Sequence, residues 1–543
     1  MLTGLALLGG WVLGAQTTSP ILSTYLGGSG FDAGDAIATD PSGGSYVAGV
    51  TSSRDFPISR WFQASPTGGF LTHYDALGRV LYSTYLGRTV SEISGVAVGP
   101  DGSAFVAGTV LGTHTYQGFL EKISPSGSTL EYDVTFGEDF SAHTSSSAVA
   151  VDAAGNAYVE SNTGGFETWV EKIDPQGLPV WRVSLPKTTL TQDAGGIAID
   201  PAGNIYVAGN TFPPLLNTRQ DVFVTRLDPS GAVVFTTIFG GFGIDTAQAI
   251  ALAPDGSVWV GGVTRSGDFP TLNPLQAAKK GVQDLFLTRL SPAGAILAST
   301  YLGGSDNDLF EGLATDSAGF LYLRSSAYYA PDSPLLDPSQ PGCVDELVSK
   351  LSPSFELLGS TCVPGAGIDG FGVIWATLAV DAGRRVHLTG GTSGGLPVVN
   401  AAQPQPGGGV DAFLTVLQIN RPPDCSAALA SPASIWPPDG RLVPIAVRGA
   451  TDPEGDPVTL TITGVRQDEP FQGTANATGI GTPNVSLRAD RDGKGDGRVY
   501  HLSFTATDPQ GASCAGMVAV CVPHDQGRGA TCGDGGGLFN SGG

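Results

Sequence analysis

Three aspartates stand at matching places in a repeated stretch of the chain and are the first candidates for metal chemistry. Each lies eight residues before the equivalent turn position of its repeat, and they are Asp32, Asp245 and Asp308. A ring of such carboxylates around a channel would suit Ca²⁺ or another hard cation, which prefers oxygen ligands. The alternative is that each aspartate accepts hydrogen bonds from backbone N–H groups of its own Gly-rich loop. Repetition across the copies favours this structural role, because a single functional site breaks symmetry.

A second acidic segment lies nearer the C-terminus, where Asp490, Asp492 and Asp496 alternate with Arg, Gly and Lys. The pattern is partly like a calcium loop, in which acidic side chains recur at short intervals. However, Lys494 occupies a position where a ligand oxygen is needed, and His501 replaces the closing Glu of an EF-hand. The segment is therefore a calcium candidate, with a plain Gly/Asp hairpin loop as its alternative.

Two motifs that suggest catalysis lack the structural context that each requires. Residues 391–395, GTSGG, match a nucleophile elbow, but that motif needs a strand-to-helix turn and no helix pattern follows. Residues 365–370, GAGIDG, match a dinucleotide-binding motif without a βαβ unit around it. The histidines are scattered, and His387 replaces an aromatic residue of a predicted strand, which indicates a packed core histidine. We expect no enzyme active site and no cofactor beyond the calcium candidates.

The cysteines predict disulfides. The six are Cys343, Cys362, Cys425, Cys514, Cys521 and Cys532, and an even number in an exported chain favours pairing. Cys343 and Cys362 flank a predicted hairpin and are expected to face each other across it. Cys425 is expected to join Cys514 or Cys521, with Cys532 taking the remaining partner.

Charge and the N-terminal segment indicate an extracellular protein. The net charge of −23 argues against binding to nucleic acid or to anionic membranes, which requires Lys and Arg. Residues 1–20 read as a signal peptide because an apolar core from Leu5 to Leu13 precedes the small residues Gly14 and Ala15. No later segment is long and apolar enough to insert into a membrane. We expect a secreted or cell-surface monomer.

One pattern recurs seven times: a short apolar strand, a turn with Asp, Pro or Gly, and a strand with an aromatic residue. GIAIDPAGNIYVAGNT from Gly196 is one copy, and AIALAPDGSVWVGGVT from Ala249 is the next. Each reads as a β-hairpin, and a second hairpin follows it. Two hairpins make a four-stranded sheet, the size of a β-propeller blade. The sequence therefore predicts an all-β protein with a seven-bladed β-propeller over residues 21–420.

The two ends of this region predict that the propeller closes into a ring. The seventh unit has a third strand from Asp411 but no fourth. The sequence of the missing fourth strand is found at the N-terminal end of the region, since ILSTYLGG at Ile21–Gly28 nearly repeats ILASTYLGG at Ile296–Gly304. We expect the N-terminal strand to complete the last blade, which removes free sheet edges.

The stretch YLGGSGFDAGDAIATDPSGGSYVAGVTSSRDFP resembles the SBBP repeat, the seven-bladed β-propeller repeat of bacterial exported proteins. The likeness covers about residues 21–420 and is strongest in units one, five and six. It implies the fold and an extracellular setting. It supplies no catalytic residues to carry over.

The C-terminal part predicts a different all-β domain. Arg421-Pro-Pro is a linker signal, and alternating strands over residues 421–525 suggest an immunoglobulin-like β-sandwich. The segment TDPEGDPVTLTITGV resembles bacterial Ig-like, cadherin-like or PKD-like modules of exported proteins. Residues 526–543 are rich in Gly and read as a flexible tail.

These observations favour a non-catalytic binding or scaffold protein. Tight turns occupy one face of the predicted propeller, whereas longer and more varied loops occupy the other, where binding usually evolves. We expect that loop face to contact a glycan, a peptide or a surface protein. The alternative is an extracellular polysaccharide lyase or hydrolase that uses the channel, for which a glycosidase needs two carboxylates at a set separation. Clustered polar residues at one blade alone would favour an enzyme.

Overall fold

The computed structural model describes residues 20–541 except 113–114, 138–143, 164–166, 186–189, 213–218, 327–331, 336–345, 364, 366–376, 471–475, 494 and 526–531. The described part is all-β and contains no helix, so it offers none that would span a membrane. The chain divides into two compact units, Thr18–Ile419 and a second that holds Asn420–Gly543. All but the last residue of the predicted signal peptide 1–20 lies outside the described residues.

The first unit contains seven antiparallel four-stranded sheets within its described residues, numbered here in chain order. Sheets 1 to 3 comprise β2 (Asp32–Thr39), β3 (Ser45–Thr51), β4 (Gly69–Tyr74) and β5 (Val80–Tyr85); β6 (Val90–Val98), β7 (Ala104–Leu111), β8 (Tyr116–Ile123) and β9 (Leu130–Phe136); β10 (Thr144–Val151), β11 (Ala157–Thr163), β12 (Glu167–Ile173) and β13 (Pro179–Ser184). Sheets 4 to 6 comprise β14 (Leu190–Ile199), β15 (Ile205–Phe212), β16 (Asp221–Leu227) and β17 (Val233–Phe239); β18 (Asp245–Leu252), β19 (Val258–Thr264), β20 (Asp284–Leu290) and β21 (Ile296–Leu302); β22 (Leu309–Thr315), β23 (Leu321–Ser326), β24 (Glu346–Leu351) and β25 (Leu357–Val363). Sheet 7 comprises β26 (Thr377–Val380), β27 (Arg385–Thr392), β28 (Asp411–Gln418) and the N-terminal β1 (Leu22–Leu26).

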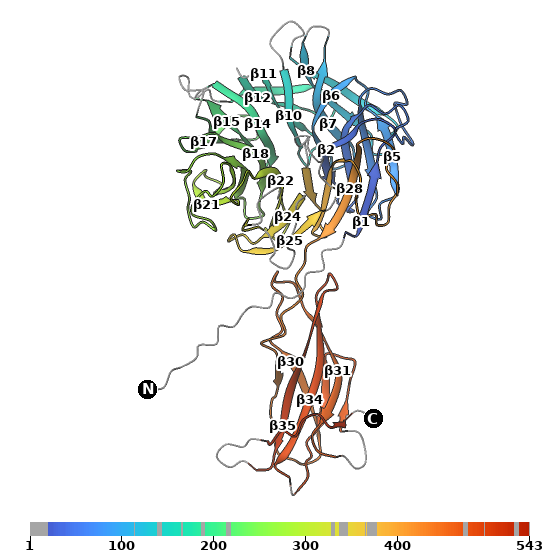
Figure 1. Ribbon diagram of the computed structural model, residues 1–543, viewed down its shortest axis with the longest axis vertical. Coiled ribbons are helices and arrows are strands. Elements are labelled where there is room, and N and C mark those ends of the chain that lie inside the picture. Colours follow the sequence, from blue (N-terminus) through green and yellow to red (C-terminus); the bar gives the residue numbers. More distant parts are fainter. Residues whose placement is uncertain are drawn as a thin grey trace. The chain divides into compact units, whose positions relative to one another are not determined.

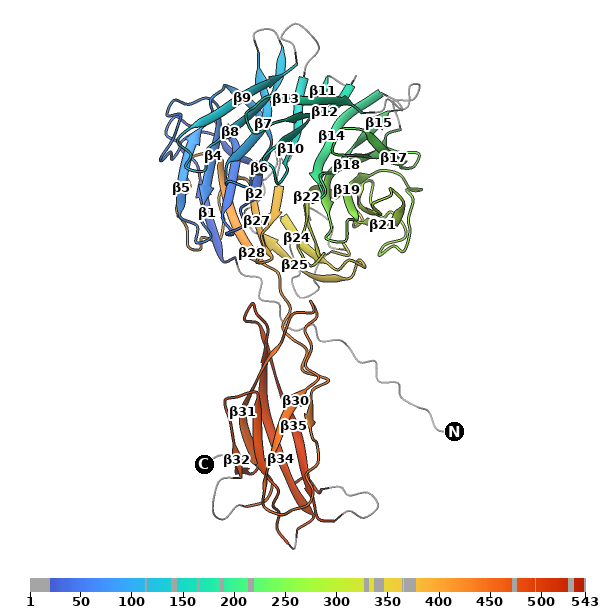
Figure 2. The ribbon, with the colours of Figure 1, turned by 180° about the vertical axis from the view of Figure 1, so that it is seen from behind.

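The seven sheets form a closed ring. The first strands contact one another in the order β2, β6, β10, β14, β18, β22 and β26, and β26 contacts β2 again. Figure 1 shows the sheets following one another around a common centre, with the blue β1 beside the orange β28. The register of that pair runs from Leu22 opposite Val416 to Leu26 opposite Ala412. The view from behind in Figure 2 shows the same closure, which joins the two ends of the ring by backbone hydrogen bonds.

The core lies between neighbouring sheets. The inner strands of the sheets, the second and the third, are largely buried because they pack on both faces; Tyr46, Val47 and Ala48 of β3 are examples. Fourth strands such as β13 and β17 have one face open to solvent. The hairpin turns repeat one design, in which an aspartate accepts the backbone N–H groups two and four residues further on, as Asp40 and Asp381 do.

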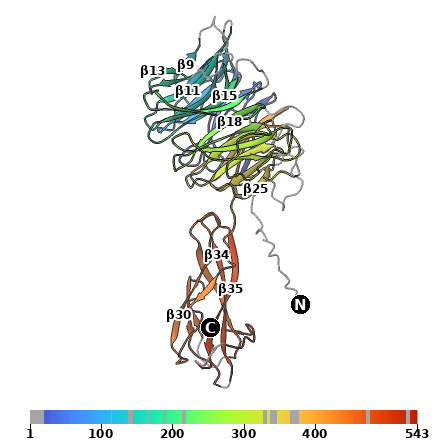
Figure 3. The same cartoon turned by 90° about the vertical axis from the view of Figure 1, so that its left-hand side faces the viewer.

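The second unit consists of two four-stranded sheets around a core of its own. One sheet orders β29 (Leu429–Ser431), β30 (Leu442–Arg448), β33 (Asn484–Arg488) and β32 (Ala477–Thr478); the other orders β35 (Ser513–Pro523), β34 (Gly497–Thr507), β31 (Thr459–Gln467) and β36 (Phe539–Asn540). Figure 3 shows the long strands β34 and β35 side by side, as their eleven-residue pairing requires. Ile445, Ile462, Leu487 and Phe504 are among the buried residues that fill the core.

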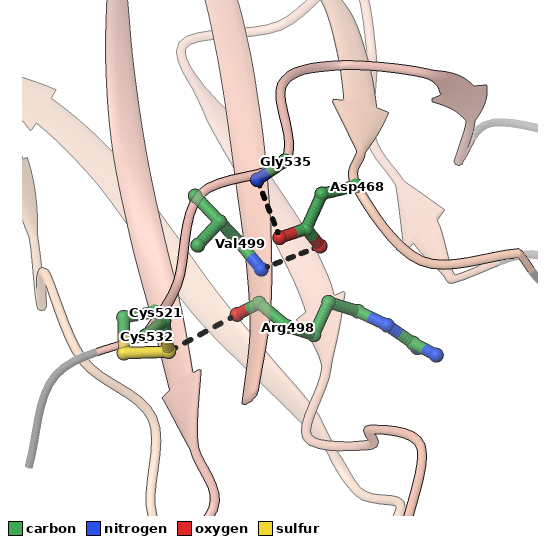
Figure 4. The surroundings of a disulfide bond; sticks show 6 residues. All are labelled: Asp468, Arg498, Val499, Cys521, Cys532 and Gly535. Carbon is green, nitrogen blue, oxygen red and sulfur yellow. Dashed lines mark hydrogen bonds between the residues drawn. A yellow bond between two sulfur atoms is a disulfide. The ribbon is translucent and has the colours of Figure 1, made fainter. Parts of the chain in front are cut away.

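Two disulfides tie the second unit together and decide between the pairings that the sequence leaves open. Cys425 is bonded to Cys514, and Cys521 is bonded to Cys532. Beside the second bond, the Cys532 Sγ lies 3.5 Å from the carbonyl oxygen of Arg498 (Figure 4). Cys343 lies outside the described residues, so its pairing with Cys362, which lies in β25, stays a prediction.

The described part of the predicted flexible tail 526–543 is built into the second unit, which corrects the expectation. Its residue Cys532 is held by the disulfide, the Gly535 amide lies 3.5 Å from Asp468 Oδ2, and β36 pairs with β31 (Figure 4). Gly-rich composition therefore gave the wrong expectation here, because a covalent bond and a strand pairing order the segment.

Candidate functional site

Asp32 occupies the entrance of sheet 1 and is fully buried. Its Oδ2 accepts hydrogen bonds from the Gly28 amide at 2.8 Å and from the Ser53 hydroxyl at 2.7 Å, and its Oδ1 accepts one from the Thr51 hydroxyl. The side chain thereby joins the crossing loop before β2 to the loop after β3. This is the structural arrangement that the sequence offers as the alternative to a metal site.

Sheet 5 repeats this arrangement, and sheet 6 repeats its contact with the backbone amide. Asp245 Oδ2 accepts the Gly241 amide at 2.7 Å and the Ser266 hydroxyl at 2.8 Å. Asp308 accepts the Gly304 amide at 3.0 Å, and burial, reinforced by Asp284 and other carboxylates, raises the pKa of Asp308 to about 7. The three predicted ligands thus belong to three different sheets.

The second set of predicted ligands is exposed. Asp490, Asp492 and Asp496 all lie at the surface of the second unit, and Lys494 between them is outside the described residues. Asp490 Oδ1 accepts the neighbouring Arg491 amide at 2.9 Å. Among the residues that the structure describes, no three His, Cys, Asp or Glu side chains gather closely enough to hold a metal ion. Calcium binding by either set stays a prediction.

We expect the D245N variant to lose about 1–3 kcal/mol of unfolding free energy, because an amide nitrogen then faces donors that need an acceptor. Calorimetric unfolding in Ca²⁺ and in EGTA measures this loss, which should be equal in both buffers. A melting temperature that Ca²⁺ raises in the wild type but not in D245N would instead identify Asp245 as a metal ligand. A rise that survives D245N and disappears in D490N/D492N would place the metal in the second unit.

One of the junctions between sheets departs from the pattern of the others. In six junctions, the aromatic residue of one second strand shares a core cluster with an apolar residue in the second strand of the next sheet, the one directly before its own aromatic position. The pairs are Tyr46 and Ala104, Phe105 and Ala157, Tyr158 and Ile205, Tyr206 and Val258, Trp259 and Leu321, and Tyr322 and Val386. In the junction of sheets 7 and 1, the corresponding residues are His387 and Ser45. Both are 1% exposed, and Ser45 Oγ lies 2.7 Å from His387 Nδ1.

The other ring nitrogen of His387 contacts an aspartate. His387 Nε2 lies 3.1 Å from Asp381 Oδ2, which also accepts a hydrogen bond from Arg385 Nε at 2.6 Å. Burial alone raises the pKa of Asp381, but the hydrogen bonds from His387 and Arg385 outweigh it and lower the pKa to about 2. In sheet 3 the hydroxyl of Tyr158 reaches Asp152 at 3.0 Å, so the contact of Asp381 belongs to the repeat.

Ser45 is the residue that sequence reasoning missed. His387 is buried as predicted, but its partner across the junction lies 342 positions away in the chain. The available signal was a serine at a position where the other copies carry Ala, Ile, Val or Leu.

A cavity of about 530 Å³ opens over these residues. Its lining consists of Ile21, Leu22, Gly43, Ser45, Asp75, Ala76, Leu77, Arg385, His387, Asn400 and Val416. Gly43 and Asp75 lie in hairpin turns of sheet 1, and Arg385 begins β27 directly after the hairpin turn of sheet 7, so the cavity lies on the turn face of the ring. A cavity of this volume is in the range of small-molecule sites.

The loop face carries an exposed aromatic side chain. Phe242, in the crossing from sheet 4 to sheet 5, is 81% exposed, whereas the equivalent positions of two other crossings are Ser29 and Ser305. Its amide donates to Asp268 at 2.9 Å, which fixes the backbone. The Arg219 guanidinium lies 5.7 Å from the centre of the Phe242 ring.

Comparison with known proteins supports the repeat. Residues 188–211 match the family model SBBP, described as a beta-propeller repeat. No curated protein matches the chain at a significant level. Among solved structures, PorZ of Porphyromonas gingivalis, a surface component of the type-IX secretion system, is 15% identical with a TM-score of 0.40. That match covers 89% of this chain and 59% of PorZ.

Two further solved structures match over a smaller part of this chain. The gluconolactonase XC5397 of Xanthomonas campestris is 11% identical with a TM-score of 0.35, and the match covers 74% of this chain and all of the enzyme (100%). Sqt1 of Chaetomium thermophilum is 14% identical with a TM-score of 0.40, covering 75% of this chain and 100% of Sqt1. Similarities this distant carry no argument about function.

Proposed function

We propose that the protein is exported and acts by binding a partner on the loop face of its ring. In this proposal the ring is a seven-bladed β-propeller, and the second unit is an immunoglobulin-like sandwich that serves as a spacer or a second contact. The partner is a glycan, a peptide or a surface protein. The exposure of Phe242 is the observation that carries the proposal.

Phe242 has the properties of a binding anchor. Burial of an exposed aromatic ring is among the largest gains that one side chain contributes to an interface, and aromatic residues and Arg are enriched at such sites. Two other crossings carry serine at the position of Phe242, so the repeat does not require an aromatic residue there. The hydrogen bond from its amide to Asp268 and the contact with Arg219 order the loop before a partner arrives, which reduces the entropy cost of binding.

The carboxylates of the loop face support a scaffold role. Asp32, Asp245 and Asp308 each accept a hydrogen bond from a glycine amide of their own crossing. Asp55 accepts the amide of Ser29 and Asp268 accepts the amide of Phe242, each the residue after that glycine. These groups fix the loops that would present a partner site. A polysaccharide-degrading enzyme would need two such carboxylates free to reach one sugar.

We expect the F242S variant, which introduces the residue found at this position in two other crossings, to weaken binding by about tenfold or more. The secreted protein is applied to glycan and peptide arrays and to intact cells, and the affinity for any captured partner is measured for both forms. The matched control is L178S, because Leu178 is 62% exposed but lies in a hairpin turn on the opposite face. Equal binding by F242S and the wild type would refute the loop-face site.

A further inference from the structure

The hydrogen bonds of the 7–1 junction allow one assignment of the protons in a neutral imidazole. Asp381 is ionised and only accepts, so His387 Nε2 carries the hydrogen of the 3.1 Å contact. His387 Nδ1 then has a lone pair, and the Ser45 hydroxyl donates to it across 2.7 Å. Ser45, His387 and Asp381 therefore form a relay in which the imidazole is poised to take the proton of the hydroxyl.

The relay is a departure from the repeat at two positions that face each other. A junction of the ring needs only an aromatic residue against an apolar one, as Tyr46 and Ala104 show. Burying a hydroxyl and an imidazole is costly unless each finds a partner. In this junction His387 replaces the aromatic residue, Ser45 replaces the apolar one, and a cavity lies beside them. A functional site accounts for this joint change, whereas a structural role shared by all junctions does not.

The cavity supplies the other parts that a reaction needs. Ser45 and His387 contribute to its lining, and Leu22, Leu77 and Val416 give it an apolar wall that suits an acyl chain. Arg385, which also lines the cavity, is a guanidinium that can stabilise negative charge on an oxygen. Its Nε is held by Asp381, so its orientation is set by the same aspartate that orients His387.

We propose that this cavity is an acyl-ester hydrolase site with Ser45 as nucleophile, His387 as general base and Asp381 as the residue that positions the imidazole. The site is on the turn face and goes beyond the binding function proposed for the loop face. Its substrate is a small ester with an apolar acyl chain.

The reaction follows the general scheme of an activated serine. Ser45 Oγ forms a bond to the ester carbonyl carbon while its proton passes to His387 Nδ1, and the carbonyl oxygen becomes an oxyanion near Arg385. Collapse of this intermediate breaks the bond to the alcohol, which leaves with the proton from Nδ1. Water then attacks the acyl group on Ser45, gives one proton to Nδ1, and releases the carboxylic acid as the serine recovers its proton.

The test uses the full secreted chain, a fluorophosphonate probe and p-nitrophenyl esters of increasing acyl length. The variants are S45A and H387Y, which restore residue types of other junctions and are therefore expected to fold; calorimetry checks this. The control is S83A, since Ser83 is also buried in sheet 1 and its hydroxyl bonds the Thr72 hydroxyl at 2.9 Å instead of a histidine ring nitrogen.

We expect the probe to label the wild type and S83A but not S45A, and ester hydrolysis to fall by about a hundredfold or more in S45A and H387Y. Absence of labelling and of hydrolysis in the folded wild type overturns the proposal, as does labelling that persists in S45A. Neither outcome depends on Phe242, so failure of this site and failure of the loop-face site are separate results.

Discussion

Replacing Arg324 by alanine is expected to lower the free energy of unfolding by about 3–5 kcal/mol. Arg324 is 0% exposed, and its Nε lies 3.0 Å from a carboxylate oxygen of both Glu311 and Glu346. Its Nη1 donates to the carbonyl oxygens of Thr377 and Thr389 in the neighbouring sheet. The side chain thus joins three strands of sheet 6 to sheet 7, and its removal takes a donor from buried carbonyl oxygens and the cation from two buried carboxyl groups.

The proton balance of this cluster explains why one arginine suffices for two carboxyl groups. Burial and the proximity of Glu346 raise the pKa of Glu311 well above its ordinary value, more than Arg324 lowers it. The raised pKa favours the neutral form of Glu311, which leaves the contact of Arg324 with Glu346 as the ion pair of the cluster. Loss of Arg324 removes the cation beside Glu346, which predicts that a second change at Glu346 reverses part of the damage.

Urea unfolding followed by tryptophan fluorescence measures this effect. Trp259 is fully buried, and its ring lies 5.2 Å from that of Phe355, so it reports on the contact of sheets 5 and 6. We expect R324M/E346Q to be more stable than R324M, although it carries one more substitution. The matched control is R79M, because Arg79 pairs with Asp75 at the surface and such pairs contribute about 1 kcal/mol or less. A loss in R324M no greater than that in R79M would show that the cluster does not hold the junction.

The repeated elements of the ring were predictable from sequence because the pattern of each element recurs several times along the chain. The turn aspartates act through local hydrogen bonds two and four residues away, a pattern that a single hairpin contains. The closing strand was predictable for a different reason. Ile21–Gly28 resembles Ile296–Gly304, so the two segments are expected to form equivalent strands. The structure agrees, since β1 pairs with β28.

The candidate site was not predictable in this way, because it depends on which sheets become neighbours. Ser45 and His387 are each a one-residue departure from a copy of the repeat, and neither carries a motif. Only closure of the ring brings the first sheet against the last and places the two side chains 2.7 Å apart. The partners of Arg324 are equally hidden, since two of them are backbone carbonyls of sheet 7 that have no sequence signature.

The disulfides of the second unit could not be paired from the spacing of the cysteines, and their removal is expected to have a large effect on stability. The sequence allows Cys425 to pair with Cys514 or with Cys521, and spacing alone does not choose. The observed pairs, Cys425–Cys514 and Cys521–Cys532, enclose very different lengths of chain, with separations of 89 and 11 residues. A disulfide stabilises mainly by restricting the unfolded chain, and this effect grows with the length of the loop.

We therefore expect C425A/C514A to cost the second unit about 4–5 kcal/mol and C521A/C532A about 3 kcal/mol. Double alanine variants are used because a single substitution would leave a free thiol, and a reductant would act on both bonds at once. Calorimetric unfolding of the full chain identifies the transition of the second unit as the one that either pair of changes shifts. The smaller loss in C521A/C532A has a further reason, since β36 still pairs with β31 and holds the segment beyond Cys532. An equal or larger loss in C521A/C532A would contradict the dependence on loop length and would mean that this bond stabilises the folded unit directly.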